Sequence, residues 1–264
     1  MINNDAYSSI CFTKNDISDM KFNNLHDFNN LSFKLALAAA FMMILAVSSH
    51  RAGFFTFQLA LMGLAAGSLI ALAAMGFGLI EMFRARKDKK AQTAPTAAGA
   101  TLGFLVIMPV LITILSSIGT PMIHDIATDL EHPPEFIAIK ALRSATDNPL
   151  DRSQSVTLTA IQKQSYPDIE SLLIDRPFDV VFEQIVELVK KRGWEVVVIS
   201  AANGRIEATD TTPIMGFKDD VVIRVNREAN RTRVDMRSVS RVGKGDLGTN
   251  AARIRSFLND LISD

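Results

Sequence analysis

Two long uncharged stretches constrain this chain more than any other feature of its sequence. Residues 54–80 and 91–123 contain no Asp, Glu, Lys or Arg, and no stretch of comparable length follows residue 123. An α-helix rises about 1.5 Å per residue, so about 20 apolar residues cross a hydrocarbon core about 30 Å thick. The pattern predicts an integral membrane protein with a helical anchor followed by a soluble domain.

The anchor is expected to occupy residues 31–119 and to contain three transmembrane helices, over residues 31–49, 54–80 and 97–118. The first helix has a competing interpretation, because Ala-Val-Ser at residues 46–48 fits a signal-peptide cleavage site. The preceding residues 1–30 are long and acidic, whereas a signal peptide starts with a short basic region. We therefore predict a retained first span behind a mobile N-terminal tail at residues 1–30.

Gly63 and Gly67 share one face of the second predicted span. Glycines at this spacing let another helix backbone approach closely. Packing within the chain's own helical bundle is the favoured interpretation, and dimerisation is the alternative.

Flanking charges predict the orientation of the spans. Five basic residues lie between Arg84 and Lys90, in the loop between the second and third spans. Short basic loops remain in the cytoplasm, so the third span would carry everything after Thr120 to the opposite side. In a bacterium, the chain would be a multi-pass inner-membrane protein with a cytoplasmic N-terminus and a periplasmic C-terminal domain.

Residues 120–164 are rich in proline and polar residues, and are expected to form an irregular membrane-proximal connector. Beyond it, apolar residues at helical spacing predict a helix from Phe178 to Val189 and a second helix over residues 247–261. Between these helices, β-rich segments joined by turn sequences predict four antiparallel strands, over residues 194–200, 205–209, 220–226 and 232–241.

The order of these elements predicts an α+β domain over residues 165–264. Its expected architecture is an antiparallel four-stranded sheet with two helices packed on it. Since the helices and strands can cover one another, a fragment beginning near Ser165 is expected to fold alone.

Several segments carry a family resemblance. The longest is Val-Asp-Met-Arg-Ser-Val-Ser-Arg-Val-Gly-Lys-Gly-Asp-Leu-Gly-Thr-Asn-Ala-Ala-Arg-Ile at residues 234–254, and shorter ones are Gly-Arg-Ile-Glu-Ala-Thr at 204–209 and His-Asp-Ile-Ala-Thr-Asp at 124–129. These segments resemble the domain-of-unknown-function family 1499, and the resemblance extends from about residue 123 to the end. It implies a compact α+β domain, often behind membrane segments, without an established activity or cofactor.

Residue usage argues against several chemistries. The net charge is zero, so no overall footprint for nucleic acid is present. Cys11 is the single cysteine, which excludes an internal disulfide and a thiolate metal cluster. No histidine follows His132, so Ser238 and Ser240 lack the usual base of a nucleophile. The His and Asp residues at 124–132 fit no compact zinc pattern. We predict no catalytic residue, metal or cofactor.

Basic residues gather around a glycine-rich turn at residues 243–248. Arg237 and Arg241 share one face of a strand, the turn presents backbone amides, and Asp246 is placed to cap the following helix. The candidate site for an anion or a partner comprises Arg237, Arg241, Lys244, Asp246, Arg253 and Arg255. The alternative is that the arginines form structural ion pairs with Asp220, Asp235 and other carboxylates.

These features together predict a non-enzymatic binding or envelope-assembly module. Its expected partners are the lipid bilayer and an envelope protein or anionic lipid. The competing prediction is a hydrolase-type envelope enzyme that uses carboxylates and arginines.

Overall fold

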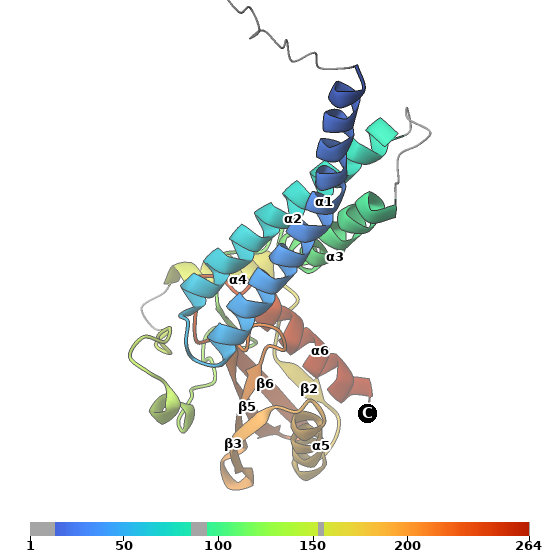
Figure 1. The fold of residues 1–264 in the computed structure, drawn as a ribbon. Helices are drawn as coiled ribbons and strands as arrows, with labels where there is room; N and C mark the ends of the chain where they lie inside the picture. The colour runs from blue at the N-terminus through green and yellow to red at the C-terminus, as the bar shows by residue number, and fades with distance from the viewer. Residues whose placement is uncertain (1–13, 86–93, 153–155, 264) are drawn as a thin grey trace, which may run out of the picture. The chain divides into compact units, whose positions relative to one another are not determined.

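A computed structural model describes residues 14–85, 94–152 and 156–263 of the chain. The chain divides into two compact units, residues 1–112 and 113–264. The first unit is helical and the second contains a sheet (Figure 1). Residues 1–13 of the predicted tail, and all of the predicted basic loop beyond Ala85, lie outside the described residues.

Three helices make up the first unit and the start of the second: α1 (Lys14–Arg51), α2 (Phe57–Ala85) and α3 (Ala94–Ser116). Each helix contains a stretch that is long and apolar enough to cross a membrane, at Leu31–Arg51, Phe57–Arg84 and Ala97–Ser116. The prediction of three apolar helices is confirmed. α1 also includes residues 14–30, where the sequence predicted a tail. A helix that is already nucleated propagates into polar sequence at little cost.

Small residues allow the three apolar helices to approach closely. A Cβ added to Gly63 of α2 would lie 2.7 Å from Ala46 Cβ of α1, and one added to Gly67 would lie 2.5 Å from Met43 Cγ. Both glycines therefore face a helix of the same chain, as expected for packing within the bundle. Gly103 of α3 contacts α2 in the same way. Such contacts stabilise membrane helices through van der Waals packing.

The second unit contains a six-stranded antiparallel sheet, which confirms the predicted α+β class and adds two strands to the expected four. The four long strands follow one another in the order β6 (Arg231–Ser240), β5 (Lys218–Glu228), β4 (Arg205–Thr211) and β3 (Glu195–Ser200). The free edge of β6 pairs with two strands of three residues each, β1 (Asp125–Ala127) and β2 (Leu172–Ile174).

Two helices cover one face of the sheet, α5 (Phe178–Lys191) and α6 (Thr249–Ser263), and confirm the predicted pair (Figure 1). Phe182, at the centre of the predicted apolar stripe of α5, is only 5% exposed. The core between the layers includes Val181, Ile185, Val189, Ile223, Met236, Ile254 and Phe257.

The other face of the sheet is covered by residues 128–152. Their short 3-10 helix η1 (Ile139–Leu142) contributes to a second buried cluster, which consists of Phe136, Ile139, Val222 and Val239. Successive strand residues point to opposite faces, which places Val222 opposite to the core residue Ile223. Residues 120–164, expected to be an irregular connector, thus contain β1, η1 and α4 (Val156–Ser165) and belong to the sheet's own unit.

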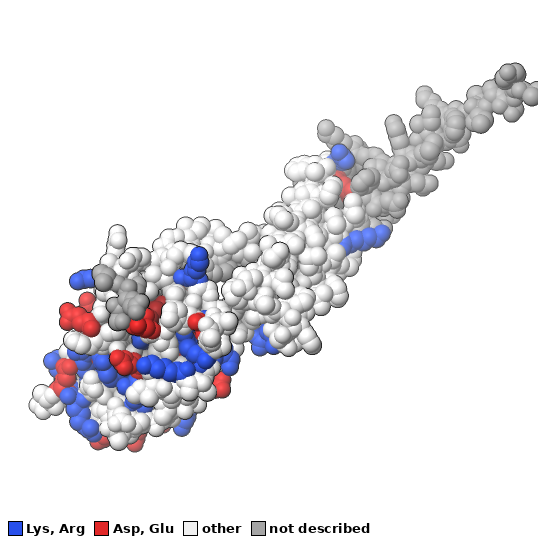
Figure 2. Space-filling view, turned by 90° about the vertical axis from the view of Figure 1, so that its left-hand side faces the viewer, with Lys and Arg blue, Asp and Glu red and all other residues white. Residues whose placement is uncertain are grey.

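The two units differ in the number of charged side chains on their surfaces, as they do in hydropathy. Figure 2 shows Lys, Arg, Asp and Glu side chains interleaved on the sheet-containing unit, whereas the described surface of the helices is almost uncharged in this view. Several charged residues of the second unit are buried, and they define the candidate site.

Candidate functional site

Four carboxylates are buried on the sheet face beneath residues 128–152: Asp125, Glu207, Asp220 and Asp235 are each 4% exposed or less. Taking an ionised carboxylate out of water costs several kcal/mol, so each requires a cation or several hydrogen-bond donors. The structure supplies those partners both from the sheet and from residues 128–152, which we call the covering segment.

Asp235 of β6 accepts hydrogen bonds from two arginines. Arg224 Nη2 and Arg233 Nε lie 2.8 Å and 3.1 Å from its Oδ2. Asp129 of the covering segment binds the same two arginines, at 2.9 Å and 3.0 Å. Burial would raise the pKa of Asp129, but the His132 amide and the Arg224 guanidinium outweigh it and lower this pKa. The four charged groups fasten the covering segment to the sheet.

Asp220 holds the segment at a second point. Arg143 Nε of the covering segment lies 2.7 Å from Asp220 Oδ2, and Arg241 Nη2 lies 2.9 Å from Oδ1. The adjacent Asp219 points to the opposite face, where Arg253 Nη2 lies 2.6 Å from its Oδ2. The two neighbouring aspartates therefore belong to separate networks.

Glu207 fixes the covering segment through its backbone. The Glu207 carboxylate accepts hydrogen bonds from the amides of Ile137 and Ile139, at 2.7 Å and 2.9 Å. This contact holds η1 against β4 and orients Phe136 into the second cluster.

Asp125 differs from the other carboxylates because two deeply buried guanidinium groups share it. Arg237 donates to it through Nε at 3.0 Å and Nη2 at 2.8 Å, and Arg152 Nη1 lies 3.0 Å from Oδ1. Both arginine side chains are 4% exposed or less. Burial lowers the pKa of Arg152 and the neighbouring Arg237 lowers it further, although Asp125 opposes both effects. Arg152 Nε has no hydrogen-bond partner among the described residues.

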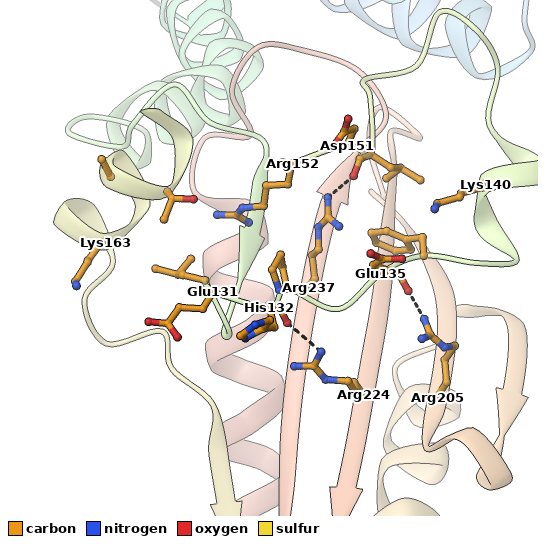
Figure 3. A pocket seen from close by; sticks show the side chains of 16 residues that line it. Glu131, His132, Glu135, Lys140, Asp151, Arg152, Lys163, Arg205, Arg224 and Arg237 are labelled. Carbon is orange, nitrogen blue, oxygen red and sulfur yellow. Dashed lines mark hydrogen bonds between the residues drawn. The ribbon is translucent and has the colours of Figure 1, made fainter. Parts of the chain in front are cut away.

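Arg152 and Arg237 line a pocket of about 1130 Å³, which we call the Arg152–Arg237 pocket. Figure 3 shows Lys163 of α4 and Lys140 of η1 on opposite sides of it, with the two arginines between them. Neither lysine has an ion-pair partner in the part of the chain that the structure describes. The charged lining is predominantly basic: Lys140, Arg152, Lys163, Arg205, Arg224 and Arg237 face Glu131, Glu135 and Asp151.

The structure places the residues of the predicted site on two faces of the sheet. Arg237 and Arg241 lie beneath the covering segment with Asp125 and Asp220, whereas Arg253 lies on the helix-covered face. Arg255 of α6 pairs with the exposed Asp168, at 2.5 Å. All four arginines therefore form ion pairs, as the structural alternative anticipated, and Arg237 is the one among them that lines the Arg152–Arg237 pocket.

Lys244 and Asp246 lie in the glycine-rich turn. Lys244 is exposed. Asp246 accepts hydrogen bonds from the amides of Gly248 and Asn250, at 2.9 Å and 2.8 Å, so it caps α6 as predicted. Burial raises the pKa of Asp246, although these amides oppose the shift. Ser238, considered and set aside as a nucleophile, is fully buried and donates to Asn250.

Sequence reasoning missed Arg143 and Arg152, because it treated the connector as irregular. Their partners lie 77 and 27 positions away in the chain, too far for any local pattern to link them. The available signal was the resemblance at residues 124–129, which contains Asp125 and Asp129.

The fold and its site define a protein with three helices that could span a membrane and an α+β domain whose sheet is sealed by a charged segment. A family model described as "Protein of unknown function (DUF1499)" matches residues 125–261, just over half of the chain. The chain belongs to this family, which confirms the resemblance. The match begins at β1, so the family's domain includes the covering segment. A search of curated proteins gave no match.

Proposed function

We propose that this protein is a membrane-anchored, non-enzymatic binding module that holds an anionic group of its ligand in the Arg152–Arg237 pocket. The observation that carries the proposal is the sharing of Asp125 by two buried guanidinium groups. Within the described ion pairs, the one carboxylate of Asp125 balances one of these two positive charges, which leaves a second positive charge buried beside the pocket. An anion would neutralise it in surroundings of low dielectric, where the attraction is strongest.

The chemistry of the lining residues supports an anionic ligand. Guanidinium groups match the oxygens of carboxylates and phosphates, and Arg152 Nε is a donor without a partner among the described residues. Lys140 and Lys163 extend from opposite sides on flexible stems and can reach an anion between them (Figure 3). A phosphate or carboxylate group is therefore the expected recognition element.

The residues that line the pocket favour ligand binding over hydrolysis. Nucleophilic catalysis needs a nucleophile and a base within hydrogen-bond reach. His132 also lines the pocket, but among the described lining residues no hydrogen bond between a side-chain nucleophile and a base is present. The pocket is suited to holding a ligand.

Melting measurements on the full chain in lipid nanodiscs test this function, with inorganic phosphate, pyrophosphate and citrate as probes. At least one probe should raise the melting temperature, because a ligand at 100 times its Kd stabilises the folded state by about 2.7 kcal/mol. Lys140→Gln with Lys163→Gln should remove the rise. The matched control, Lys190→Gln with Lys191→Gln on α5, removes the same charge and should keep it. No rise with any probe, or equal loss in both double variants, would contradict the proposal.

The proposed location is a bacterial inner membrane, with the basic loop in the cytoplasm and the α+β domain in the periplasm. The excess of basic residues between Arg84 and Lys90 supports this orientation. Packing of Ala46 against Gly63 favours retention of the first span.

Alkaline phosphatase fusions check the orientation, because the enzyme is active only after export. A fusion at residue 90 should be inactive and one at residue 264 should be active. The reverse pair of activities would show that the domain is cytoplasmic.

A further inference from the structure

The glycine-rich turn packs against the segment that follows α3. Asp246 donates its amide to the Ile123 carbonyl at 3.1 Å, and a Cβ added to Gly248 would lie 3.1 Å from Thr120 Cγ2. Thr120 lies four positions after Ser116, where α3 ends, and four positions of extended chain span at most about 14 Å. The chain itself therefore keeps this turn close to the end of the third apolar helix.

Three large apolar side chains are exposed in this region. Ile118, Met122 and Leu247 are 72%, 73% and 51% exposed. Leu247 also has a φ of +55°, a left-handed conformation that leucine rarely adopts. The backbone conformation costs the same in any solvent, whereas the exposed leucine side chain would be more stable in apolar surroundings than in water.

A second pocket, of about 560 Å³, lies beside these side chains and is lined by Thr120, Tyr166, Arg192, Leu247 and Arg255 among others. Tyr166 is 8% exposed, and its buried hydroxyl has no hydrogen-bond partner among the described residues. Arg192 Nε is also buried and has no hydrogen-bond partner among the described residues. The Arg192 and Arg255 side chains keep 19% and 39% of their surface exposed, although each is paired with an aspartate.

We infer that residues 116–122 and the turn at 243–248 dock into the headgroup layer of the bilayer that holds the anchor. Leu247, Met122 and Ile118 enter the boundary between headgroups and acyl chains, where apolar side chains beside basic residues bind membranes. A phospholipid phosphate occupies the second pocket, between Arg192 and Arg255, within reach of the Tyr166 hydroxyl. This docking is independent of the ligand proposed for the Arg152–Arg237 pocket.

Depth-dependent fluorescence tests the insertion in the full chain. In a Cys11→Ser background, Leu247→Cys is labelled with a nitrobenzoxadiazole dye, and the protein is placed in nanodiscs with spin-labelled acyl chains. Val180→Cys is the control, because Val180 is 45% exposed. Its neighbour Asp179 pairs with Arg227 of β5, which lies beside Thr232 at the start of β6. The glycine-rich turn follows the other end of β6, and a strand of ten residues is about 30 Å long, so Val180 lies far from the turn.

The dye at residue 247 should emit at shorter wavelength and be quenched by the spin label, while the dye at residue 180 should show neither effect. Equal emission and equal quenching at the two positions would overturn the docking. If a protein partner covers residues 116–122 and the turn at 243–248 instead, the dye at residue 247 remains unquenched in nanodiscs of pure lipid. That result would also overturn the docking.

Native mass spectrometry tests the phosphate site. Full-length protein released from phosphatidylglycerol nanodiscs should retain at least one phospholipid, and Arg192→Gln with Arg255→Gln should lose it. Lys190→Gln with Lys191→Gln serves as the control, and near-UV circular dichroism verifies folding. Added inorganic phosphate should not displace the lipid, because the acyl chains contribute to its binding. Equal retention in both double variants would overturn the phosphate site.

Discussion

Asp125→Ala should destabilise the sheet-containing unit by about 3–5 kcal/mol, because removing one partner of a buried ion pair leaves an uncompensated charge. Here two guanidinium groups, those of Arg152 and Arg237, would lose the carboxylate with which both pair in the described structure. The midpoint of urea unfolding is the appropriate measurement. Trp194 is the only tryptophan of the chain and is 6% exposed in the core, so its fluorescence reports this unit within the full-length protein.

Asp168→Ala is the matched control. Asp168 also pairs with an arginine, Arg255, but its side chain is 54% exposed. Exposed pairs contribute about 0–1 kcal/mol, so this variant should unfold near the wild-type midpoint. If the two alanine variants lost equal stability, the buried network would not hold the covering segment as described. Phosphate should partly restore Asp125→Ala if the neighbouring pocket accepts anions.

A fragment of residues 165–264 should fail to unfold cooperatively, whereas a fragment of residues 113–264 should show a single sharp transition. The shorter fragment lacks β1 with its Asp125, Phe136, and the two arginines of the covering segment, Arg143 and Arg152, so Arg237 would lose Asp125 and Asp220 would lose Arg143. It would expose Val222 and Val239 and leave Glu207 without the amides it accepts. This expectation reverses the one drawn from the sequence, which placed the whole fold after Ser165.

Urea titration followed by Trp194 fluorescence distinguishes the two fragments, since Trp194 is present in both. The slope of the transition reports the surface exposed on unfolding and should be steeper for the longer fragment. A sharp transition in the fragment 165–264 would show that the covering segment is dispensable.

The regular elements of this fold were predictable because their patterns are local. The apolar runs identify the three apolar helices, and the spacing from Phe178 to Val189 identifies α5. The four long strands follow from β-rich segments separated by turns such as Ala-Asn-Gly at residues 202–204. In contrast, β1 and β2 have three residues each, too few for a period to develop.

The covering segment was not predictable for a different reason. Its structure is fixed by side chains that meet distant parts of the sheet, such as Arg143 with Asp220 and Asp129 with Arg233. Prolines and polar residues indicate a loop, and nothing local distinguishes a loop that packs on a sheet from one that remains in solvent. For the same reason, the clustering of Arg237, Arg241 and Arg253 in the sequence did not reveal that they divide between two faces.

The central claim is that the Arg152–Arg237 pocket holds an anion, and anomalous diffraction tests it most directly. Crystals of the full chain grown with tungstate, a heavy analogue of phosphate, locate the ion without knowledge of the natural ligand. We expect a tungsten peak inside this pocket, placed so that a tungstate oxygen accepts a hydrogen bond from Arg152, with Lys140 and Lys163 turned toward the ion. Tungsten peaks confined to exposed lysines elsewhere, with this pocket empty, would contradict it.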